Sequence, residues 1–598
     1  MKILVCIKQV PNVAAMKLNP ETKTLVREGV PLEVSSFDVR ALLKAVELCK
    51  AGGLPSEAHP AGAKEGEAVA LTMGPPQAAK ALEQCLALGA NRAIHLCDRA
   101  FAGADTLATA RALAAAIKAE KPDLVFCGRY STDSETGQVG PEVAEILDLP
   151  QATGVRSIAI NGTTATVERE TDEGFETVEL PLPCLITAAE DLAPERFPSK
   201  KDREAAKTKT ITTLTAAQLA IDVATIGQAG SPTWVKDVVT TAAKRTCTFV
   251  ATVDELVAAL RRRNAFARPV VSVPTGVKRV RGTGPAVWVL AEGTKRVTLE
   301  LIGKGAELAA ALKGELTVVS LGHDVKRHAP LYASYGVDRV YVCDHAELAP
   351  YRTEPHAAVL TRAIRDRKPH ILLAPSTSIG RDLLPRVAAR LGLGLTGDAI
   401  DLRMDGTNLV ADKPAFGGNV VAPILTKTTP QMATVRPGLL RPPVPDPARQ
   451  AEIVELAFEG SSRTRVTASK PAGGNVDLDA AEVVVGVGMG IGGPESLPVI
   501  RELADALKAP LATTRDCTDK GWLPRQHQVG LTGKCIAPRL YFAIGIRGAF
   551  EHTVGIQKAG TIVAINNDDQ AMIWDSADIG IKGDWKEIVP ALAKAIRS

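Results

Sequence analysis

The chain has 598 residues, of which 45% are apolar and 23% are charged, and 71 Lys and Arg against 67 Asp and Glu leave a formal net charge of +4. This balance excludes a disordered or collagen-like chain, and the evenly spread positive charge gives no indication of a nucleic-acid partner. At about 150 residues per domain, the length predicts about four domains.

The cysteines and the apolar runs indicate which metal sites and which cellular compartment to expect. Ten cysteines occur singly and never as CxxC, which disfavours a zinc site, an iron–sulfur cluster and a disulfide framework, so we expect no metal. Lys8 interrupts the opening apolar residues before they reach the length of a secretory signal, and no apolar run approaches ~18 residues. We therefore expect a cytoplasmic protein without membrane insertion.

The first section of the chain alternates strand-like apolar runs with Ala-rich segments of helical period. The runs are MKILVCI at 1–7, AVALTM at 68–73, AIHLC at 93–97 and DLVFCG at 123–128. This alternation is typical of parallel α/β units. Two additions follow, a polar section with alternating strand-like runs over 156–190 and a Lys-rich arm at 190–210.

A second section repeats the first. GANRAIHLCD at 89–98 corresponds to GVDRVYVCD at 336–344, KPDLVFCG at 121–128 to KPHILLAP at 368–375, and PEVAEILDL at 141–149 to PRVAARLGL at 385–393. Three matched blocks at nearly constant offset indicate a duplication. Gly, Pro and basic residues predict linkers, which divide the chain into domains. The linkers cover 266–284 and 460–478, and the domains cover 1–265, 285–459 and 479–598.

The third section has a doubly wound nucleotide-domain pattern, with strand-like runs in EVVVGVGMGIGG at 482–493, LYFAIGI at 540–546 and TIVAIN at 561–566. The glycines at 486–493 expose backbone amides to a phosphate, although such glycines are as common in a plain tight turn. The loops HQVGLTGKCIAP and GIRGAFEH add amides, a hydroxyl and a histidine. We predict an α/β fold with two duplicated doubly wound parallel-sheet domains and a carboxyl-terminal Rossmann-like domain.

Familiar catalytic signatures are missing from the sequence. It has no GxSxG elbow, no HExxH, no Walker A loop and no recognisable nucleophile pair, so we assign no catalytic residue. Nucleotide-type loops without an acid, base or nucleophile suit a carrier whose cofactor performs the chemistry. Two other classes stay open: an NAD-dependent dehydrogenase that uses the glycine turn at 486–493, and a non-redox adenine-nucleotide-binding protein.

The quoted motifs resemble the electron transfer flavoprotein family. The segments EVVVGVGMG, TTRDCTDKGWLP, QVGLTGK, APRLYFAIGIRGAFEHTVG, TIVAINND and ADIGIKGDW resemble the FAD domain of its alpha subunit. STSIGRDLLPRVAARLGLGLTGD, PAFGGN and ATVRPG resemble the amino-terminal part of that subunit, and ILVCIKQVP, LTMGPPQA, FAGADTLATA and CGRYSTDSETGQVGPEVAE resemble the beta subunit. The chain therefore resembles beta and alpha fused in that order, as an internal pseudo-heterodimer.

The resemblance implies one FAD in the carboxyl-terminal domain. A flavin that gains an electron gains negative charge, which a cation such as Arg515 or a donor such as His552 would stabilise, and Thr532 suits a hydrogen bond near flavin N5. Met489 stands where the family usually has Arg, and Arg547 stands where it has Ser, so we expect Arg547 to compensate part of the pyrophosphate charge. The implied contacts are Gly488, Met489, Gly490, Thr514, Arg515, Gln528, Val529, Gly530, Leu531, Thr532, Arg547, Gly548, Ala549, Phe550, Glu551, His552, Asn566, Asp584 and Trp585.

The resemblance also implies a second nucleotide in the beta-like half. In the family this site holds either AMP or a second FAD that takes hydride from NADH and bifurcates the electron pair. The loop at 137–141 and FAGADTLAT resemble the two-FAD type, whereas SSFD at 35–38 and Lys200 in the arm depart from it. The implied partners are a flavin-dependent dehydrogenase and a membrane or soluble redox acceptor. The implied contacts are Cys6, Ser35, Phe37, Asp38, Met73, Asp105, Thr106, Gly128, Arg129, Thr132, Thr136, Gly137, Gln138 and Val139.

Overall fold

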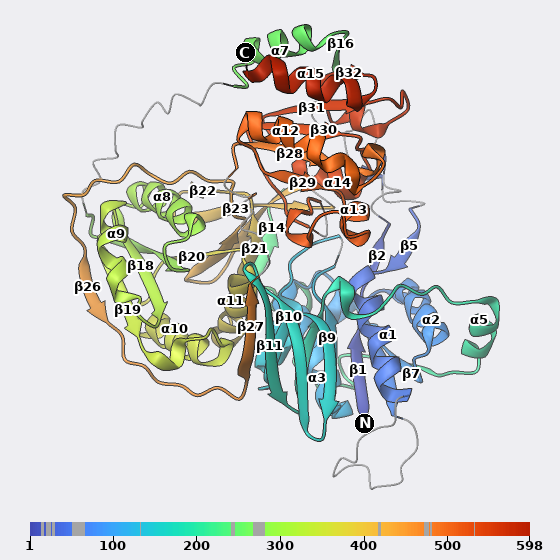
Figure 1. Cartoon of the computed structure of the whole chain (residues 1–598). Helices are drawn as coiled ribbons and strands as arrows, with labels where there is room; N and C mark the ends of the chain where they lie inside the picture. The colour runs from blue at the N-terminus through green and yellow to red at the C-terminus, as the bar shows by residue number, and fades with distance from the viewer. Residues whose placement is uncertain are drawn as a thin grey trace. The chain divides into compact units, whose positions relative to one another are not determined.

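The computed structural model contains two compact units (Figure 1). Unit 1 comprises residues 1–240, 279–416 and 421–471, and unit 2 comprises 241–278, 417–420 and 472–598. None of the described helices is both long and apolar enough to cross a lipid bilayer. The described residues are 1–12, 17–18, 25–26, 30–50, 66–131, 133–237, 239–240, 245–266, 281–416, 420–471, 478, 481–530 and 533–597.

The first half of unit 1, residues 1–240, is built on a sheet with a parallel core. Its apolar runs form the parallel strands, and the Ala-rich segments form helices that cover them, as the alternation predicts. The parallel strands, in spatial order, are β13 (Ile211–Leu214), β7 (Arg92–Leu96), β6 (Glu67–Met73), β1 (Lys2–Cys6), β8 (Leu124–Gly128), β12 (Cys184–Ala188) and β9 (Gln151–Asn161). The main helices are α1 (Ser36–Lys50), α2 (Ala79–Leu88), α3 (Thr106–Glu120), α4 (Val139–Ile146) and α5 (Lys200–Ala206).

The second half of unit 1, residues 279–416 and 421–471, has a parallel sheet of the same design. Its strand order is β26 (Glu452–Glu455), β19 (Arg339–Asp344), β18 (Gly314–Gly322), β17 (Gly284–Ala291), β20 (Ile371–Pro375), β25 (Gln431–Val435) and β21 (Leu395–Ala399). Position by position in the chain, this is the order of the first sheet, which agrees with the duplication seen in the sequence. The main helices are α8 (Arg296–Ala311), α9 (Ala329–Ser334), α10 (Thr353–Arg367) and α11 (Ser378–Leu391).

The two halves exchange edge strands. In the first half β10 (Thr164–Glu170) and β11 (Gly174–Pro181) continue the sheet as an antiparallel hairpin, and β27 (Arg465–Pro471) from the second half pairs with β11 (Figure 1). In return, β14 (Thr233–Val235) pairs with β24 (Val420–Thr426), which belongs to the antiparallel sheet of β22 (Asp401–Asp405) and β23 (Asn408–Ala415). Part of the stretch predicted as a linker over 460–478 is therefore a paired strand.

Unit 2 is a six-stranded, wholly parallel sheet of the doubly wound type. Residues 248–262, which precede the linker predicted at 266–284, form its edge strand and a covering helix. The spatial order is β16 (Thr248–Val250), β32 (Ile579–Lys582), β31 (Thr561–Asn566), β30 (Leu540–Ile544), β28 (Val483–Val487) and β29 (Leu511–Thr513). The helices are α7 (Val253–Arg262), α12 (Leu497–Leu507), α13 (Arg515–Asp519), α14 (Phe550–Thr553) and α15 (Trp585–Arg597).

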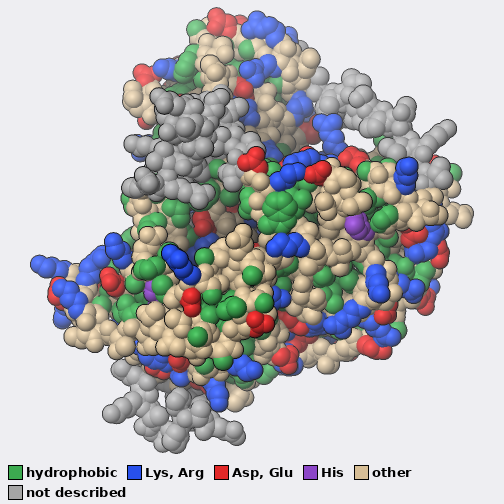
Figure 2. Space-filling view, turned by 180° about the vertical axis from the view of Figure 1, so that it is seen from behind, with side chains coloured by type: hydrophobic (Ala, Val, Ile, Leu, Met, Phe, Trp, Pro, Cys, Tyr) green, Lys and Arg blue, Asp and Glu red, His purple; other side chains and the backbone are tan. Residues whose placement is uncertain are grey.

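Each of the three sheets buries apolar side chains on both of its faces, as parallel sheets do. The predicted fold class is therefore confirmed: two duplicated doubly wound parallel-sheet domains and a Rossmann-like domain. On the face shown in Figure 2, acidic and basic side chains are interspersed. Ligands bind at the carboxyl ends of the strands in doubly wound folds, so the candidate sites are expected at these edges of the sheets.

Candidate functional site

In unit 2, the glycine turn after β28 packs directly against the turn after β30. Gly488 N donates to Ile544 O at 3.0 Å, and Gly490 N donates to Gly545 O at 2.9 Å. A Cβ atom on Gly488 or Gly490 would lie 2.5 or 2.7 Å from Gly545 O, so both positions require glycine for backbone packing. Met489, between these two glycines, is half-buried, and Gly490 is exposed, so this part of the turn is open to a ligand.

His552 is buried and uses both of its ring nitrogens within the protein. Its Nδ1 lies 2.9 Å from Val529 O, and its Nε2 lies 3.0 Å from the hydroxyl of Tyr541. Because a carbonyl only accepts, Nδ1 carries the proton and Nε2 accepts from Tyr541. Burial lowers the pKa of His552 to about 4, so the ring is neutral. In this arrangement His552 ties the loop between α13 and β30 to Tyr541 of β30, and its single N–H is used within the protein.

One neighbour of His552 was missed by the sequence reasoning. Tyr541 is the second residue of β30, and its hydroxyl occupies the space where a Cβ atom on Gly486 would stand, at 1.8 Å. The signal was present, since a glycine inside a strand often marks a close approach by another group.

The loop over 528–530 lies between α13 and β30 in the chain and packs against β29 and α14. Val529 N donates to Thr513 O at 3.0 Å, and the buried Gln528 accepts from the Thr518 hydroxyl at 2.9 Å. Gly530 has a φ of +143°, and a Cβ atom there would lie 2.1 Å from Glu551 O. The predicted residues Leu531 and Thr532 lie outside the described residues, and of Phe550 only the backbone is described.

Two arginines stand at this edge of the sheet. Arg515 begins α13, and its Nε lies 3.1 Å from Asp519 Oδ2 in a pair that leaves the arginine side chain 41% exposed. Arg547 is exposed and makes no ion pair with any residue that the structure describes. Ala549 and Glu551, which follow it, are exposed as well, whereas Gly548 is buried at a φ of +89°.

The last three predicted flavin contacts behave differently from one another. Asn566 is buried, donates to Ile546 O at 2.9 Å and thereby holds the turn after β30. Asp584 follows β32, and its Oδ1 accepts from Lys586 N at 3.0 Å at the start of α15. Trp585 packs into the apolar core of unit 2 and is 8% exposed, so its side chain does not join the others at the sheet edge.

In the first half of unit 1, several predicted residues meet at the carboxyl ends of β1 and β8. Asp38 accepts from Lys8 N at 2.8 Å and from Gly128 N at 3.0 Å, and burial raises its pKa to about 7. A Cβ atom on Gly128 would lie 2.2 Å from Asp38 Oδ1. The Phe37 ring packs on Tyr130 with a centroid distance of 4.7 Å. Cys6 and Ser35 are buried beside this cluster.

A second cluster links α3 to α4. The Thr106 hydroxyl lies 2.7 Å from Gln138 Oε1 and 3.0 Å from Glu142 Oε1. Gln138 Nε2 is buried without a hydrogen-bond partner among the described residues, which leaves a donor for a ligand or a water. The Asp105 carboxylate, in contrast, accepts hydrogen bonds from Ala108 N, Thr233 N and the Thr233 hydroxyl, so its oxygens are already paired within the protein.

The remaining predicted residues frame these two clusters. Gly137 has a φ of +65°, which favours glycine, at the start of α4. Arg129 donates to Glu170 Oε2 at 2.8 Å. Met73, Thr136 and Val139 are half-buried, and Thr132 lies outside the described residues. Sequence reasoning missed Lys8, whose Nζ lies 2.8 Å from Asp133 Oδ1.

Comparisons with known proteins agree with this geometry. The family model of the electron transfer flavoprotein domain matches residues 22–219 and again 287–460, and that of the electron transfer flavoprotein FAD-binding domain matches 477–557. The first model thus matches both halves of unit 1, and the second matches the glycine turn and the loops around His552. The chain belongs to the electron transfer flavoprotein family.

Three relatives illustrate the relationship, each across about half of this chain. The electron transfer flavoprotein subunit alpha of Clostridium acetobutylicum is 41% identical over 325 residues, which are 52% of this chain and 97% of that protein. The acryloyl-CoA reductase electron transfer subunit beta of Anaerotignum propionicum is 37% identical over 352 residues, 52% of this chain and 95% of that protein. The lactate dehydrogenase (NAD(+),ferredoxin) subunit LctC of Acetobacterium woodii is 40% identical over 307 residues, 50% of this chain and 73% of that protein.

Proposed function

We propose that the chain is an electron transfer flavoprotein with its beta-like and alpha-like parts fused, which carries electrons between redox proteins through bound FAD. The observation that carries this proposal is the double match of one family domain to the two halves of unit 1, followed by a match to the FAD-binding domain. A conventional member has these parts on separate subunits, so one chain would replace the heterodimer. Bound FAD supplies one- and two-electron chemistry that no side chain offers.

The carboxyl edge of unit 2 suits FAD. The turn is open to a pyrophosphate at the half-buried Met489 and the exposed Gly490, although the N–H groups of Gly488 and Gly490 are engaged within the protein, and the exposed Arg547 supplies a positive charge near the same turn. Arg515 stands at the start of α13, where its charge would stabilise negative charge on a bound isoalloxazine ring. His552 positions the loop around Val529 through its two ring hydrogen bonds.

We further propose that the first half holds a second FAD and not AMP. Gly137 and Val139 are small or apolar where an AMP-type loop supplies polar side chains, and a longer dinucleotide needs such an open, backbone-lined channel. The name of one relative, a lactate dehydrogenase (NAD(+),ferredoxin) subunit, joins a pyridine nucleotide to ferredoxin and so supports NADH as electron donor and electron bifurcation within this proposal. A one-FAD carrier with AMP is the alternative.

The arm at 190–210 is our candidate for contact with a dehydrogenase or a redox acceptor. Lys200 occupies the place where relatives carry an apolar recognition residue, but Phe197 in the same arm is 77% exposed. Aromatic side chains are enriched in protein–protein interfaces, so we propose Phe197 as the contact residue of the arm.

One experiment decides among these alternatives. The purified full chain is examined by absorbance, and its cofactors are released by acid and quantified by chromatography. About two FAD per chain with bleaching by NADH supports bifurcation, whereas two FAD without bleaching supports only the binding proposal. One FAD plus one AMP refutes the second FAD. A colourless protein that binds NAD, or an adenine nucleotide without a reducible chromophore, refutes the electron-carrier proposal.

A further inference from the structure

Three side chains meet between α3 and α4 in the first half, beside the loop that carries the proposed nucleotide contacts. The Thr106 hydroxyl lies 2.7 Å from Gln138 Oε1 and 3.0 Å from Glu142 Oε1. A hydroxyl has one proton to donate, so it cannot donate to both of these oxygens. With the Gln138 oxygen facing Thr106, one of the two contacts needs a second proton, and a carboxylic acid at Glu142 can supply it.

The surroundings of Glu142 favour the neutral acid. The residue is 1% exposed, and its Oε2 has no hydrogen-bond partner among the residues that the structure describes. Burial raises the pKa of Glu142 well above its usual range, and the nearby charge of Asp105 raises it further. Arg111 opposes this shift only weakly, because its guanidinium donates to two backbone carbonyls. Since a buried carboxylate without a paired cation is costly, the proton lies on Glu142 Oε1, which donates to Thr106.

The elements packed against α4 provide no cation for Glu142 within the described part of the chain. The two arginines that α11 directs at α4 both pair with Glu145, one turn further along the helix. The titratable groups that face α4 are Asp105 and Arg111 of α3, Cys127 of β8, and Arg386 and Arg390 of α11, and the uncharged ones are Gln151 of β9 and Leu185 and Thr187 of β12.

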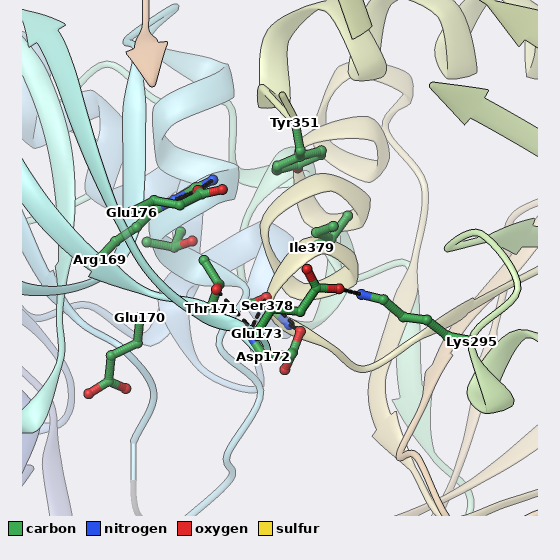
Figure 3. A pocket seen from close by; sticks show the side chains of 11 residues that line it. Arg169, Glu170, Thr171, Asp172, Glu173, Glu176, Lys295, Tyr351, Ser378 and Ile379 are labelled. Atoms are coloured by element: carbon green, nitrogen blue, oxygen red, sulfur yellow. Dashed lines mark hydrogen bonds and ion pairs between the residues drawn. The ribbon is translucent and has the colours of Figure 1, made fainter. Parts of the chain in front are cut away.

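The equivalent residues of the second half carry a different set of charges. The matched blocks and the equal lengths of α3 and α10 identify them, for Thr106, Gln138 and Glu142 in turn, as Thr353, Asp382 and Arg386. Asp382 accepts from Thr353 and, at 2.7 Å, from Tyr351, which lines the crevice of about 190 Å³ in Figure 3. Two further donors reach Asp382 from β9. The buried carboxylate of the second half thus has four donors, whereas Glu142 has a single polar contact among the described residues.

We propose that the protonated Glu142 donates to Thr106, that Thr106 donates to Gln138 Oε1, and that this chain of hydrogen bonds fixes the Gln138 NH₂ group as a donor to an acceptor oxygen of the nucleotide in the first half. Glu142 is thus a positioning residue. Gln138 is 2% exposed, and its Nε2 has no partner among the described residues, so it is free to donate to a ligand. The ligand part of this proposal rests on the proposed function, whereas the protonation of Glu142 does not.

Ionisation of Glu142 would reverse the chain of hydrogen bonds. The carboxylate would accept the Thr106 proton, so Gln138 would have to turn its NH₂ group to Thr106 and its oxygen to the nucleotide. An oxygen facing an acceptor oxygen of the ligand repels it, so the charge of Glu142 decides whether the site binds or rejects that atom.

Infrared difference spectroscopy of the full chain tests the protonation. The spectrum of the wild type minus that of Glu142→Gln is expected to show the carbonyl stretching band of a protonated carboxylic acid at neutral pH. Glu83→Gln is the matched control, because Glu83 is an exposed acidic residue of the same half, and this variant is expected to lose carboxylate bands only. If Glu142→Gln also loses carboxylate bands only, the proposal is overturned.

Retention of nucleotides by the purified full chain tests the hydrogen bonds. FAD and AMP per chain are quantified during dialysis, which distinguishes loss of a second FAD from loss of AMP. Thr106→Val and Gln138→Met each remove one link and are expected to lose one nucleotide about tenfold faster than the wild type, the effect of one hydrogen bond of ordinary strength. Nucleotide retention by Thr106→Val equal to that of the wild type overturns the proposal.

The pH dependence of the same measurement tests the role of Glu142. As the pH rises, the wild type is expected to lose this nucleotide faster because Glu142 ionises, whereas Glu142→Gln, whose amide donates to Thr106 at every pH, is not. Identical pH profiles for the two proteins overturn the proposal. A wild-type chain with neither a second FAD nor AMP refutes the proposed nucleotide site and with it the ligand role of Gln138, but the infrared band still decides the protonation of Glu142, so the two failures are distinguishable.

Discussion

Asp382 offers a sharp test of how the two halves of unit 1 are joined. Its carboxylate is 1% exposed and accepts four hydrogen bonds, two from each half. From β9, Gln151 Nε2 donates at 2.8 Å and the Thr153 hydroxyl at 2.9 Å. From the second half, the Tyr351 hydroxyl donates at 2.7 Å, and the Thr353 hydroxyl donates to the same oxygen. We expect Asp382→Asn to destabilise this junction, because an amide replaces one acceptor oxygen with a donor.

The size of the effect follows from which oxygen is replaced. If the new NH₂ faces Gln151, that amide must flip, and its oxygen then leaves Arg386, which donates to it at 3.2 Å. If the NH₂ faces Tyr351 and Thr353, both hydroxyls must turn to accept. Two hydrogen bonds to a charged acceptor are lost in either case, at about 1.5–3 kcal/mol each, so we expect a loss of about 3–5 kcal/mol.

Thermal unfolding measures this loss. Unit 1 spans more than 400 residues, for which 1 kcal/mol corresponds to about 1 °C in the unfolding midpoint, so the expected decrease is about 3–5 °C. The matched control is Asp366→Asn, which alters an exposed carboxylate 3.8 Å from Arg362 and is expected to change the midpoint by less than 1 °C. An Asp382→Asn midpoint as close to wild type as that of the control refutes the reasoning.

Three further predictions concern the proposed function. Arg515→Ala is expected to lower the reduction potential of the bound FAD by tens of millivolts, since about 60 mV corresponds to 1.4 kcal/mol of lost charge stabilisation. Lys520→Ala, which removes an exposed charge, is expected to leave the potential unchanged. Equal potentials for the two variants in a potentiometric titration contradict this prediction. Because the folded-state pKa of His552 is about 4, the unfolded chain takes up a proton first, so the stability of unit 2 should fall by about 3 kcal/mol as the pH decreases from about 6.5 to 4. The variant His552→Gln, which keeps both hydrogen bonds without titrating, should remove this contribution to urea-unfolding midpoints, and an unchanged pH profile would exclude His552 as its source. Phe197→Ser should slow electron exchange with the dehydrogenase partner at unchanged FAD content, while Val223→Ser, at another exposed apolar site (58% against 77% for Phe197), should not; equal rates for the two variants would show that the arm makes no such contact.

Regular structure was predictable where burial on both faces imposes a continuous apolar run. DLVFCG at 123–128, for example, becomes β8, because both sides of the strand face apolar helices. The strand β27 was not predictable in this way. Most of its side chains are exposed, so its sequence reads as a linker, and only its pairing with β11 from the other half makes it a strand. Pairing between distant segments leaves no local hydrophobic period.

The candidate site shows the same difference between what the local sequence indicates and what contacts between distant segments decide. The sequence alone determined which loops carry glycines, hydroxyls and charges at the carboxyl ends of strands, because those residue types follow each apolar run directly. Tertiary structure decided which of those groups remain available to a ligand. The Asp105 carboxylate is hydrogen-bonded to Thr233, and the His552 ring is hydrogen-bonded to Tyr541 and Val529, so these groups are not free for a ligand. Each partner comes from a segment that only the fold brings within hydrogen-bonding distance. Arg547 keeps its charge exposed, since no described acidic group is folded against it.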